Sequence, residues 1–477
     1  MLYRFTIDKY VLLYEIVFNG GSMEQVQVND KREIFGWAMY DWANSAFSTT
    51  VGTVFLGPYI ASLAANAAKS FPDGMARLGN LPIAPDSFIP YCVSISVALQ
   101  VLFLPILGAI ADYSHLRKRM MQIFATFGAI MTVALFLVSG ALWWMGGLFF
   151  ILANLAFGAS IVFYNSYLPD IASEDQRDRV SSFGWAMGYL GDGLLLALNL
   201  AFFMFRDKLG IPTELAIRIN LASAGAWWLG FSFFTWARLH PRHARRPLPS
   251  GETYTSIGFK QLGRTIGEIR HFPETLKFLG SFFLYNDGIQ TVIAVSSTFA
   301  AAPLLRGGLE LDLNTLTIVI LIIQFTAFFG ALFWGRLANW VGAKIAIIIS
   351  LAIWSAVVIY AYYGLRGDNR VVEFMLLGVV IALVLGGSQA ISRSLFAQMI
   401  PLGREAEFYS FYEISDRGTS WIGPLLFGLM NQIFGSLRPA ILSLIFFFIV
   451  GLITLPFVNE KKAIKDVKDY ETNLTAT

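Results

Sequence analysis

The chain has 477 residues, of which 56% are hydrophobic and only 14% are charged, and its net charge is +3. Soluble domains carry about 25% charged residues, so this composition excludes a soluble globular protein and predicts a polytopic helical membrane protein. The single cysteine excludes an internal disulfide and a multi-cysteine metal site. No metalloprotease, P-loop or serine-hydrolase pattern is present, so we expect no enzyme, no cofactor and no nucleic-acid partner.

Twelve apolar runs follow a polar N-terminal tail. Each run reaches or approaches the roughly 20 residues that a helix needs to cross a bilayer. The runs lie near residues 34–63, 90–111, 119–141, 143–166, 180–205, 215–237, 274–302, 312–335, 343–364, 371–396, 405–435 and 437–458. The sequence therefore predicts an all-α membrane protein with twelve transmembrane helices in two pseudo-symmetric six-helix bundles.

A long basic segment divides the runs six and six. The expected parts are an N-terminal tail, a first bundle, a linker, a second bundle and a C-terminal tail, at residues 1–33, 34–237, 238–272, 273–458 and 459–477. Most Lys and Arg residues lie in the tails, the linker and the loops on the same side. The positive-inside rule therefore places both termini in the cytoplasm. We expect the protein in the cell (inner) membrane. The linker is either a solvated connection or a surface for anionic lipid.

The N-terminal tail lacks the architecture of a cleavable signal peptide. Its apolar piece is short, and no small-residue cleavage site follows it. Met23 stands directly before a polar lead-in to the first run, so it is a plausible start of the protein.

The first apolar run carries a polar stripe. Asp41, Asn44, Ser45, Ser48 and Gly52 follow one another at i, i+3, i+4, i+7 and i+11, which places them on one face of a helix. Lipid cannot hydrate a carboxylate, so this face should contact other helices or water. We interpret the stripe as one wall of a solute pathway.

The seventh apolar run repeats the pattern. Asp287, Gln290, Thr291, Ala294 and Thr298 have the same spacing, and an acid is again followed by an amide and a hydroxyl. Matching stripes in corresponding halves favour a duplicated transporter whose site lies between the halves. The alternative is that both acids only tie helices together through hydrogen bonds.

A second repeated pattern follows the second and eighth runs. Residues 108–119 and 335–344 resemble the loop signature of the major facilitator superfamily, Gly-x-Leu-Ala-Asp-Arg-x-Gly-Arg-Lys. The glycine of this signature lets two helices approach closely, and the acid can bind a helix N-terminus or an arginine across the interface between the halves. A simple structural turn is the alternative, most of all for the second copy. The expected gating residues are Gly108, Asp112, Arg117, Gly335 and Asn339.

Several other segments resemble the vacuole-effluxer (autophagy-related) branch of that superfamily. They are residues 33–47, 163–170, 182–191, 389–396 and 403–408. The Tyr-Asp-Trp-Ala-Asn-Ser run in the first of them is the most specific. The resemblance implies a bacterial-type member with twelve helices, and fungal members of this branch are linked with amino-acid export from the vacuole.

The eleventh run is the most charged. Glu413, Asp416 and Arg417 lie at helical spacing, and alignment of the halves sets this segment against the part of the fifth run that contains Asp192. Glu413 and Arg417 either form a self-contained ion pair or bind a zwitterion, with the arginine on a carboxylate and an acid on an ammonium. Arg393 lies near the end of the tenth run, where its side chain can simply extend to the cytoplasmic surface.

We therefore predict a secondary active transporter that moves a small polar solute, such as an amino acid or another zwitterion, by alternating access. The alternatives are a sugar or drug-like solute, or a receptor or scaffold without transport. One buried acid would carry a proton and couple transport to the proton gradient. We expect a monomer in the lipid bilayer. The predicted pathway residues are Asp41, Asn44, Ser45, Asp192, Asp287, Gln290, Glu413, Asp416 and Arg417.

Overall fold

The computed structural model describes residues 28–242, 272–311, 313–417 and 422–475, and most of these residues are helical. Most of the predicted N-terminal tail and linker lies outside the described residues. We call the helices before the linker the N-terminal half and the helices from α11 to α18 the C-terminal half.

The first crossing of the N-terminal half is one continuous rod made of α2 (Lys31–Ala46), the π-helix η1 (Phe47–Phe55) and α3 (Leu56–Ala68). A two-stranded antiparallel hairpin follows, in which Ala76 pairs with Ile83. The remaining elements of this half are β1 (Ala76–Leu78), β2 (Leu81–Ile83), η2 (Pro85–Ser87), α4 (Phe88–Asp112), α5 (Arg117–Ala134), η3 (Leu135–Leu137), η4 (Gly140–Leu142), α6 (Trp143–Asn165), α7 (Leu168–Ile171), α8 (Arg177–Phe205) and α9 (Thr213–Arg238).

The C-terminal half repeats the helical arrangement, but its eleventh crossing is described as two helices. Residues 418–421, between these two helices, lie outside the described part of the chain. The elements are α11 (Pro273–Ala301), η6 (Leu304–Arg306), α12 (Leu313–Val341), α13 (Ala343–Tyr363), α14 (Arg370–Gln398), α15 (Glu405–Arg417), α16 (Ile422–Phe434), α17 (Leu437–Ser443), α18 (Ile445–Thr454), η7 (Leu455–Phe457) and α19 (Glu460–Thr475).

Nine helices of the described residues are long and apolar enough to cross a membrane. The other three expected crossings correspond to α9, α11 and the α15–α16 pair. The first two of these contain more polar side chains, and the last consists of two shorter helices. The helices therefore agree with the predicted all-α architecture of two bundles.

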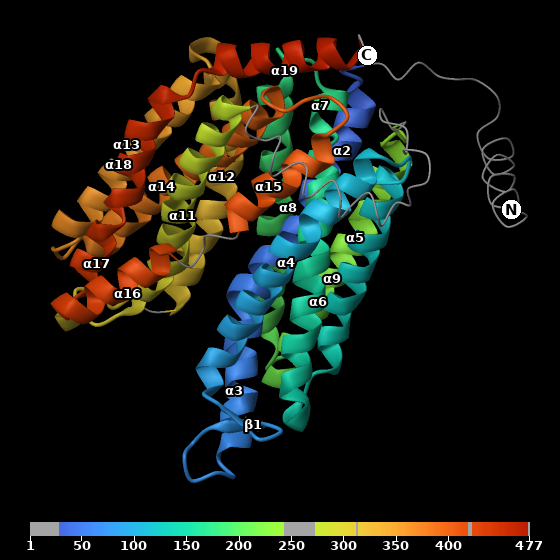
Figure 1. Cartoon of the computed structure of the whole chain (residues 1–477). Helices are drawn as coiled ribbons and strands as arrows, with labels where there is room; N and C mark the ends of the chain where they lie inside the picture. The colour runs from blue at the N-terminus through green and yellow to red at the C-terminus, as the bar shows by residue number, and fades with distance from the viewer. Residues whose placement is uncertain (1–27, 243–271, 312, 418–421, 476–477) are drawn as a thin grey trace, which may run out of the picture.

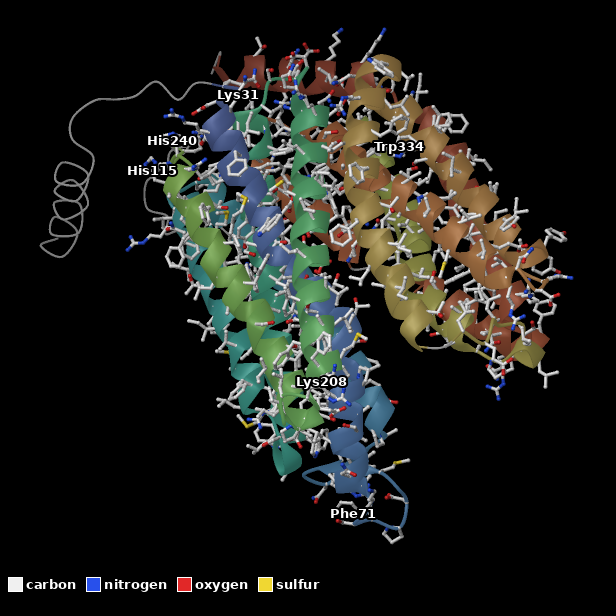
Figure 2. All side chains as sticks on the ribbon, turned by 180° about the vertical axis from the view of Figure 1, so that it is seen from behind. Lys31, Phe71, His115, Lys208, His240 and Trp334 are labelled. Atoms are coloured by element: carbon white, nitrogen blue, oxygen red, sulfur yellow. The ribbon has the colours of Figure 1, made fainter. Side chains whose placement is uncertain are left out.

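The two halves meet at one end of the molecule and separate toward the other (Figure 1). We call the first the terminal end, because α2 begins and α19 lies there, and the second the hairpin end, because β1 lies there. Lys31 and Trp334 lie toward the terminal end, and Phe71 lies at the hairpin end (Figure 2).

The predicted C-terminal tail is a helix, α19, that packs against the terminal end. The buried side chains of Ala463 and Val467 lie one turn apart, so they share one face of α19. Tyr470 makes an edge contact with Phe272, with 5.2 Å between the ring centroids. This apolar face explains why a strongly charged segment is helical although it cannot span a membrane.

Two glycines bring α8 close to α2. A Cβ on Gly188 would lie 2.7 Å from the hydroxyl oxygen of Ser45, and a Cβ on Gly184 would lie 2.7 Å from a carboxylate oxygen of Asp41. Only a residue without a side chain allows this approach. The polar stripe of the first crossing therefore lies directly against α8.

Candidate transport pathway between the halves

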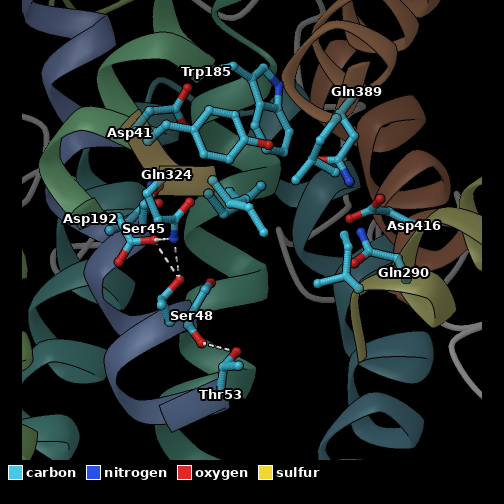
Figure 3. Close-up of a pocket in the computed structure, with 18 of the residues that line it drawn as sticks. Asp41, Ser45, Ser48, Thr53, Trp185, Asp192, Gln290, Gln324, Gln389 and Asp416 are labelled. Carbon is cyan, nitrogen blue, oxygen red and sulfur yellow. Dashed lines mark hydrogen bonds between the residues drawn. The ribbon is translucent and has the colours of Figure 1, made fainter. Parts of the chain in front are cut away.

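A cavity of about 450 Å³ lies between the two halves (Figure 3). Helices α2, η1, α6 and α8 line it from the N-terminal half, and α11, α12, α14 and α15 line it from the C-terminal half. Isoleucine, leucine and phenylalanine side chains make up much of its wall. Its polar and charged lining side chains are Asp41, Asn44, Ser45, Ser48, Thr49, Thr53, Asn165, Asp192, Gln290, Ser296, Gln324, Gln389, Arg393, Glu413 and Asp416.

The stripe of the first crossing lines this cavity, but its lower part differs from the prediction. Thr49 and Thr53 line the cavity in place of Gly52. The reason is the π-helix η1, which joins residues five apart rather than four and so changes which side chains share a face. Within it, the Thr53 hydroxyl donates to the backbone carbonyl of Ser48 at 3.2 Å.

Asp41 forms an ion pair with Arg393 across the interface between the halves. One nitrogen of the Arg393 guanidinium lies 3.2 Å from Oδ2 of Asp41, and the Tyr164 hydroxyl donates to the same oxygen at 2.7 Å. Arg393 also donates to the carbonyl and hydroxyl oxygens of Ser181, at 2.7 and 2.8 Å, and to Asn165 at 3.3 Å. The prediction that Arg393 extends to the surface is wrong, because its side chain is only 3% exposed.

Three aromatic rings surround the Arg393 guanidinium. Its central carbon lies 4.9 Å from the ring centroid of Trp37, 5.5 Å from that of Trp185 and 5.7 Å from that of Tyr164. Ring faces attract a cation, which lowers the free energy of burying this charge. The guanidinium therefore joins α14 of one half to α2, α6 and α8 of the other.

Asp192 lies on α8, and its side chain lies beside Ser45 and Gln324 (Figure 3). The Thr49 hydroxyl donates to its Oδ2 at 2.5 Å, and the Gln324 amide donates to the same oxygen at 2.6 Å. Thr49 and Asp192 belong to the N-terminal half, and Gln324 belongs to α12 of the C-terminal half. Asp192 thus takes part in a second contact between the halves.

The stripe of the seventh crossing is divided between two places. Gln290 lines the cavity, whereas Asp287 lies outside it, so the prediction that both acidic stripes share one cavity is wrong for Asp287. Its Oδ2 accepts a hydrogen bond from the backbone N–H of Gly423 at 2.7 Å. A carboxylate there satisfies a backbone donor at the start of α16, which explains why α11 turns this side chain away from the cavity.

The charged segment of the eleventh crossing contributes two acids to the cavity. Glu413 accepts a hydrogen bond from Asn165 of the N-terminal half at 2.8 Å, and Asp416 accepts one from Asn286 at 2.8 Å. The side chain of Arg417, and with it the predicted ion pair with Glu413, lies outside the described part of the structure.

Asp112 joins the two halves at the terminal end. Its two carboxylate oxygens accept hydrogen bonds from the backbone N–H groups of Ala406 and Glu407, at 3.0 and 2.8 Å. These residues form the first turn of α15, where backbone N–H groups have no partner within the helix and carry partial positive charge. Gly108 makes the approach possible, because a Cβ there would lie 2.5 Å from the carbonyl oxygen of Ala406.

Arg117 extends this contact. Its guanidinium binds Glu405 of the opposite half at 3.0 Å, and within its own half it binds Asp112 at 3.2 Å and Asp170 at 2.9 Å. All four side chains are less than a tenth exposed. Of the five residues predicted to form a gate, Gly108, Asp112 and Arg117 therefore lie in a buried contact between the halves.

Within the described residues, the second copy of the signature forms no such network. Gly335 packs closely on the opposite half, since a Cβ there would lie 2.6 Å from Cβ of Ser182. Asn339 is exposed in the last turn of α12. The second copy therefore keeps the close helix contact. Because it has an amide where the first copy has an acid, the charged contact between the halves is made by the first copy.

Further hydrogen bonds join α8 and α14 at the terminal end. The Arg177 guanidinium donates to the carbonyl of Ala397 at 3.1 Å, and the Ser181 hydroxyl donates to the carbonyl of Ala390 at 2.8 Å. With the Arg393 and Asp112 contacts, they separate the cavity from the terminal end. The halves diverge in the other direction, toward the hairpin end (Figure 1).

The sequence prediction missed several polar residues of the cavity. Gln389 lies in a segment noted for its family resemblance, Arg393 was expected at the surface, and Gln324 lies in an apolar run without a stripe. A buried amide or guanidinium inside a membrane span is itself a signal of function. That signal points to all three residues.

A solved structure of a bacterial homologue of the iron transporter ferroportin, in an outward-facing state, has the same fold. Its TM-score is 0.61 at 12% sequence identity, and the match covers 92% of this chain and 98% of that one. This likeness shows the fold, and the family and the MFS-type relative given next identify the class: the chain is a multi-pass membrane transporter of the major facilitator superfamily.

Within this class, the chain belongs to the family described as "Vacuole effluxer Atg22 like", whose model matches residues 29–468. It is 29% identical over 440 residues to an uncharacterized MFS-type transporter, YxiO, of Bacillus subtilis, and this match covers 92% of this chain and 97% of the relative. It is 26% identical over 539 residues to autophagy-related protein 22-1 of Emericella nidulans, which covers 90% and 89%.

Proposed function

We propose that this protein is a secondary active transporter for a small zwitterionic solute, such as an amino acid, which it moves by alternating access. The observation that carries the proposal is the composition of the cavity, where carboxylates and the Arg393 guanidinium from opposite halves line one volume. A solute with both charges can bind carboxylates at one end and compete for the guanidinium at the other. A solute that binds in a cavity lined by both halves couples its binding to the relative position of the halves.

A neutral sugar is the second candidate. The amides of Asn44, Asn165, Gln290, Gln324 and Gln389 line the cavity together with the indole ring of Trp185. Amides exchange hydrogen bonds with hydroxyl groups, and an aromatic ring packs on the apolar face of a sugar. The carboxylates of the cavity favour the zwitterion over the sugar.

The terminal end is the cytoplasmic end in this proposal, and the protein acts as a monomer in the inner membrane. The distribution of Lys and Arg residues supports this orientation through the positive-inside rule. The structure would then be outward-open, since the contacts between the halves lie at the terminal end.

Proton coupling through Asp41 is part of the proposal. Asp41 lines the cavity, pairs with the Arg393 guanidinium and accepts a hydrogen bond from Tyr164, so a proton on its carboxylate would weaken the contact between the halves. Asp41→Asn in proteoliposomes should abolish the dependence of solute uptake on a pH gradient. Uptake by this variant that still follows the gradient would disprove coupling through Asp41.

A thermal-shift screen of the purified protein against amino acids, short peptides and sugars tests the proposed function. A ligand that binds the folded state raises the melting temperature by mass action. We expect an amino acid to raise it, and Asp416→Asn, which alters the cavity, to weaken the effect. Asp287→Asn is the matched control, because this acid lies on the same half but outside the cavity. Stabilisation by sugars alone would replace the zwitterion by the second candidate.

A further inference from the structure

Asp192 differs from the other acid of the N-terminal half that lines the cavity. Asp41 has the Arg393 guanidinium as its cationic partner. Within the described residues, no Lys, Arg or His nitrogen lies within 4.0 Å of the Asp192 carboxylate. The side chain is only 3% exposed. A carboxylate in a membrane span without a positive partner has a high free energy, which a bound cation would lower.

The two oxygens of this carboxylate have different surroundings. Oδ2 accepts two hydrogen bonds, from Thr49 at 2.5 Å and from Gln324 at 2.6 Å. Oδ1 is buried, and it has no hydrogen-bond partner among the described residues. This carboxyl group, which lines the cavity, therefore has one oxygen that a ligand can bind.

The neighbouring groups of Asp192 are rich in neutral oxygen atoms. The hydroxyl oxygens of Ser45, Ser48 and Thr49 line the same part of the cavity, as Figure 3 shows for the first two. Thr49 lies in the π-helix, an irregularity often found at functional sites. One carboxylate among neutral oxygens matches a ligand that carries a single positive charge, since hard cations prefer oxygen ligands.

We propose that Asp192, Thr49 and Gln324 form a binding site for a monovalent cation, either an alkali-metal ion or the ammonium group of the transported solute. Gln324 comes from the half opposite to the other two, so occupancy of the site changes a contact between the halves. The cation and the conformation of the protein are then linked thermodynamically. This inference rests on the proposed function only in taking the cavity as the solute pathway.

The test is the thermal stability of the purified full-length protein in detergent, at constant pH and ionic strength. Choline chloride is replaced stepwise by sodium chloride in one arm and by ethylammonium chloride in the other. A site of this kind gives a saturable rise in melting temperature in at least one arm. A response to sodium identifies a coupled ion, and a response to ethylammonium identifies the ammonium end of the solute.

Two variants locate the response. Asp192→Asn should abolish it, and Thr49→Val should weaken the apparent affinity about tenfold, the effect of one hydrogen bond to a charged group. Asp287→Asn, a buried acid outside the cavity, should respond as the wild type does. A cooperative melting transition in choline chloride shows that each variant is folded.

Two results would overturn the site: no stabilisation above choline in either arm, or a full response in Asp192→Asn. Uptake into proteoliposomes separates this failure from that of the proposed function. If no cation binds but uptake persists, the cation site is wrong and the transporter stands. If a cation binds but no solute is taken up, the proposed function is wrong and the site stands.

Discussion

Arg393 offers the sharpest test of how the terminal end is held closed. Arg393→Gln removes the ion pair with Asp41 and the hydrogen bonds to Asn165 and Ser181, all of which join opposite halves. It also leaves Asp41 buried without a cation. Removing one partner of a buried ion pair costs about 3–5 kcal/mol. Each 1.4 kcal/mol is a factor of ten, so the lower value predicts a shift of about 100-fold toward conformations open at the terminal end.

Thiol labelling in a Cys92→Ser background can measure this shift. Ser182→Cys places a thiol against Gly335 of the opposite half, and the Ser182 hydroxyl that it replaces has no hydrogen-bond partner among the described residues. We expect Arg393→Gln to raise its labelling rate about 100-fold. Ser350→Cys, which is buried within the C-terminal half, reports unfolding and should keep its slow rate.

A double variant completes this test. Asp41→Asn combined with Arg393→Gln removes both charges, so its labelling rate should fall below that of Arg393→Gln alone by a coupling of about 0.5–3 kcal/mol. An unchanged rate in Arg393→Gln would refute the idea that this ion pair holds the terminal end closed. An equal rise at the Ser350→Cys thiol would show loss of the fold instead.

Three further predictions concern the contacts at the terminal end and the acid outside the cavity. Asp112→Ala removes two hydrogen bonds to the first turn of α15 and should raise labelling of the Ser182→Cys thiol at least tenfold; no rise would exclude a gating role. Gly108→Ala should abolish uptake in proteoliposomes, because its Cβ would lie 2.5 Å from a backbone oxygen, whereas Gly280→Ala, which meets nothing within 4 Å, should be neutral. Asp287→Asn should lower the free energy of unfolding by about 1–3 kcal/mol, through loss of a charge-assisted bond, and leave solute affinity unchanged; weaker solute binding would place Asp287 in the pathway after all.

The sequence predicted those features whose physical cause is local. Apolar length and charge distribution were enough for the two helical bundles. The acid of the loop signature was expected to bind either a helix N-terminus or an arginine across the halves, and Asp112 binds the first turn of α15. Its gating role stays a prediction. The stripe of the first crossing also lines the cavity as far as Ser48.

The features that the sequence did not predict depend on distant partners. Arg393 lies near a helix end, and partners far away in the chain, such as Asp41 and Ser181, explain why it is buried. The rotation of α11, which turns Asp287 from the cavity, depends on the start of α16. Thr49 faces the cavity because it lies in a π-helix. A search for α-helical spacing cannot find it, since a π-helix has a different spacing of side chains.

The hydrogen bonds of the Arg393 guanidinium lead to the opposite half, so they limit which N-terminal and C-terminal halves can be combined in one protein. The partners of its guanidinium, Asp41, Asn165 and Ser181, are in the N-terminal half. A C-terminal half expressed by itself would contain a membrane-embedded positive charge without these acceptors. Chimaeras that exchange halves between relatives should consequently assemble only when one half carries the arginine of position 393 and the other carries the aspartate of position 41.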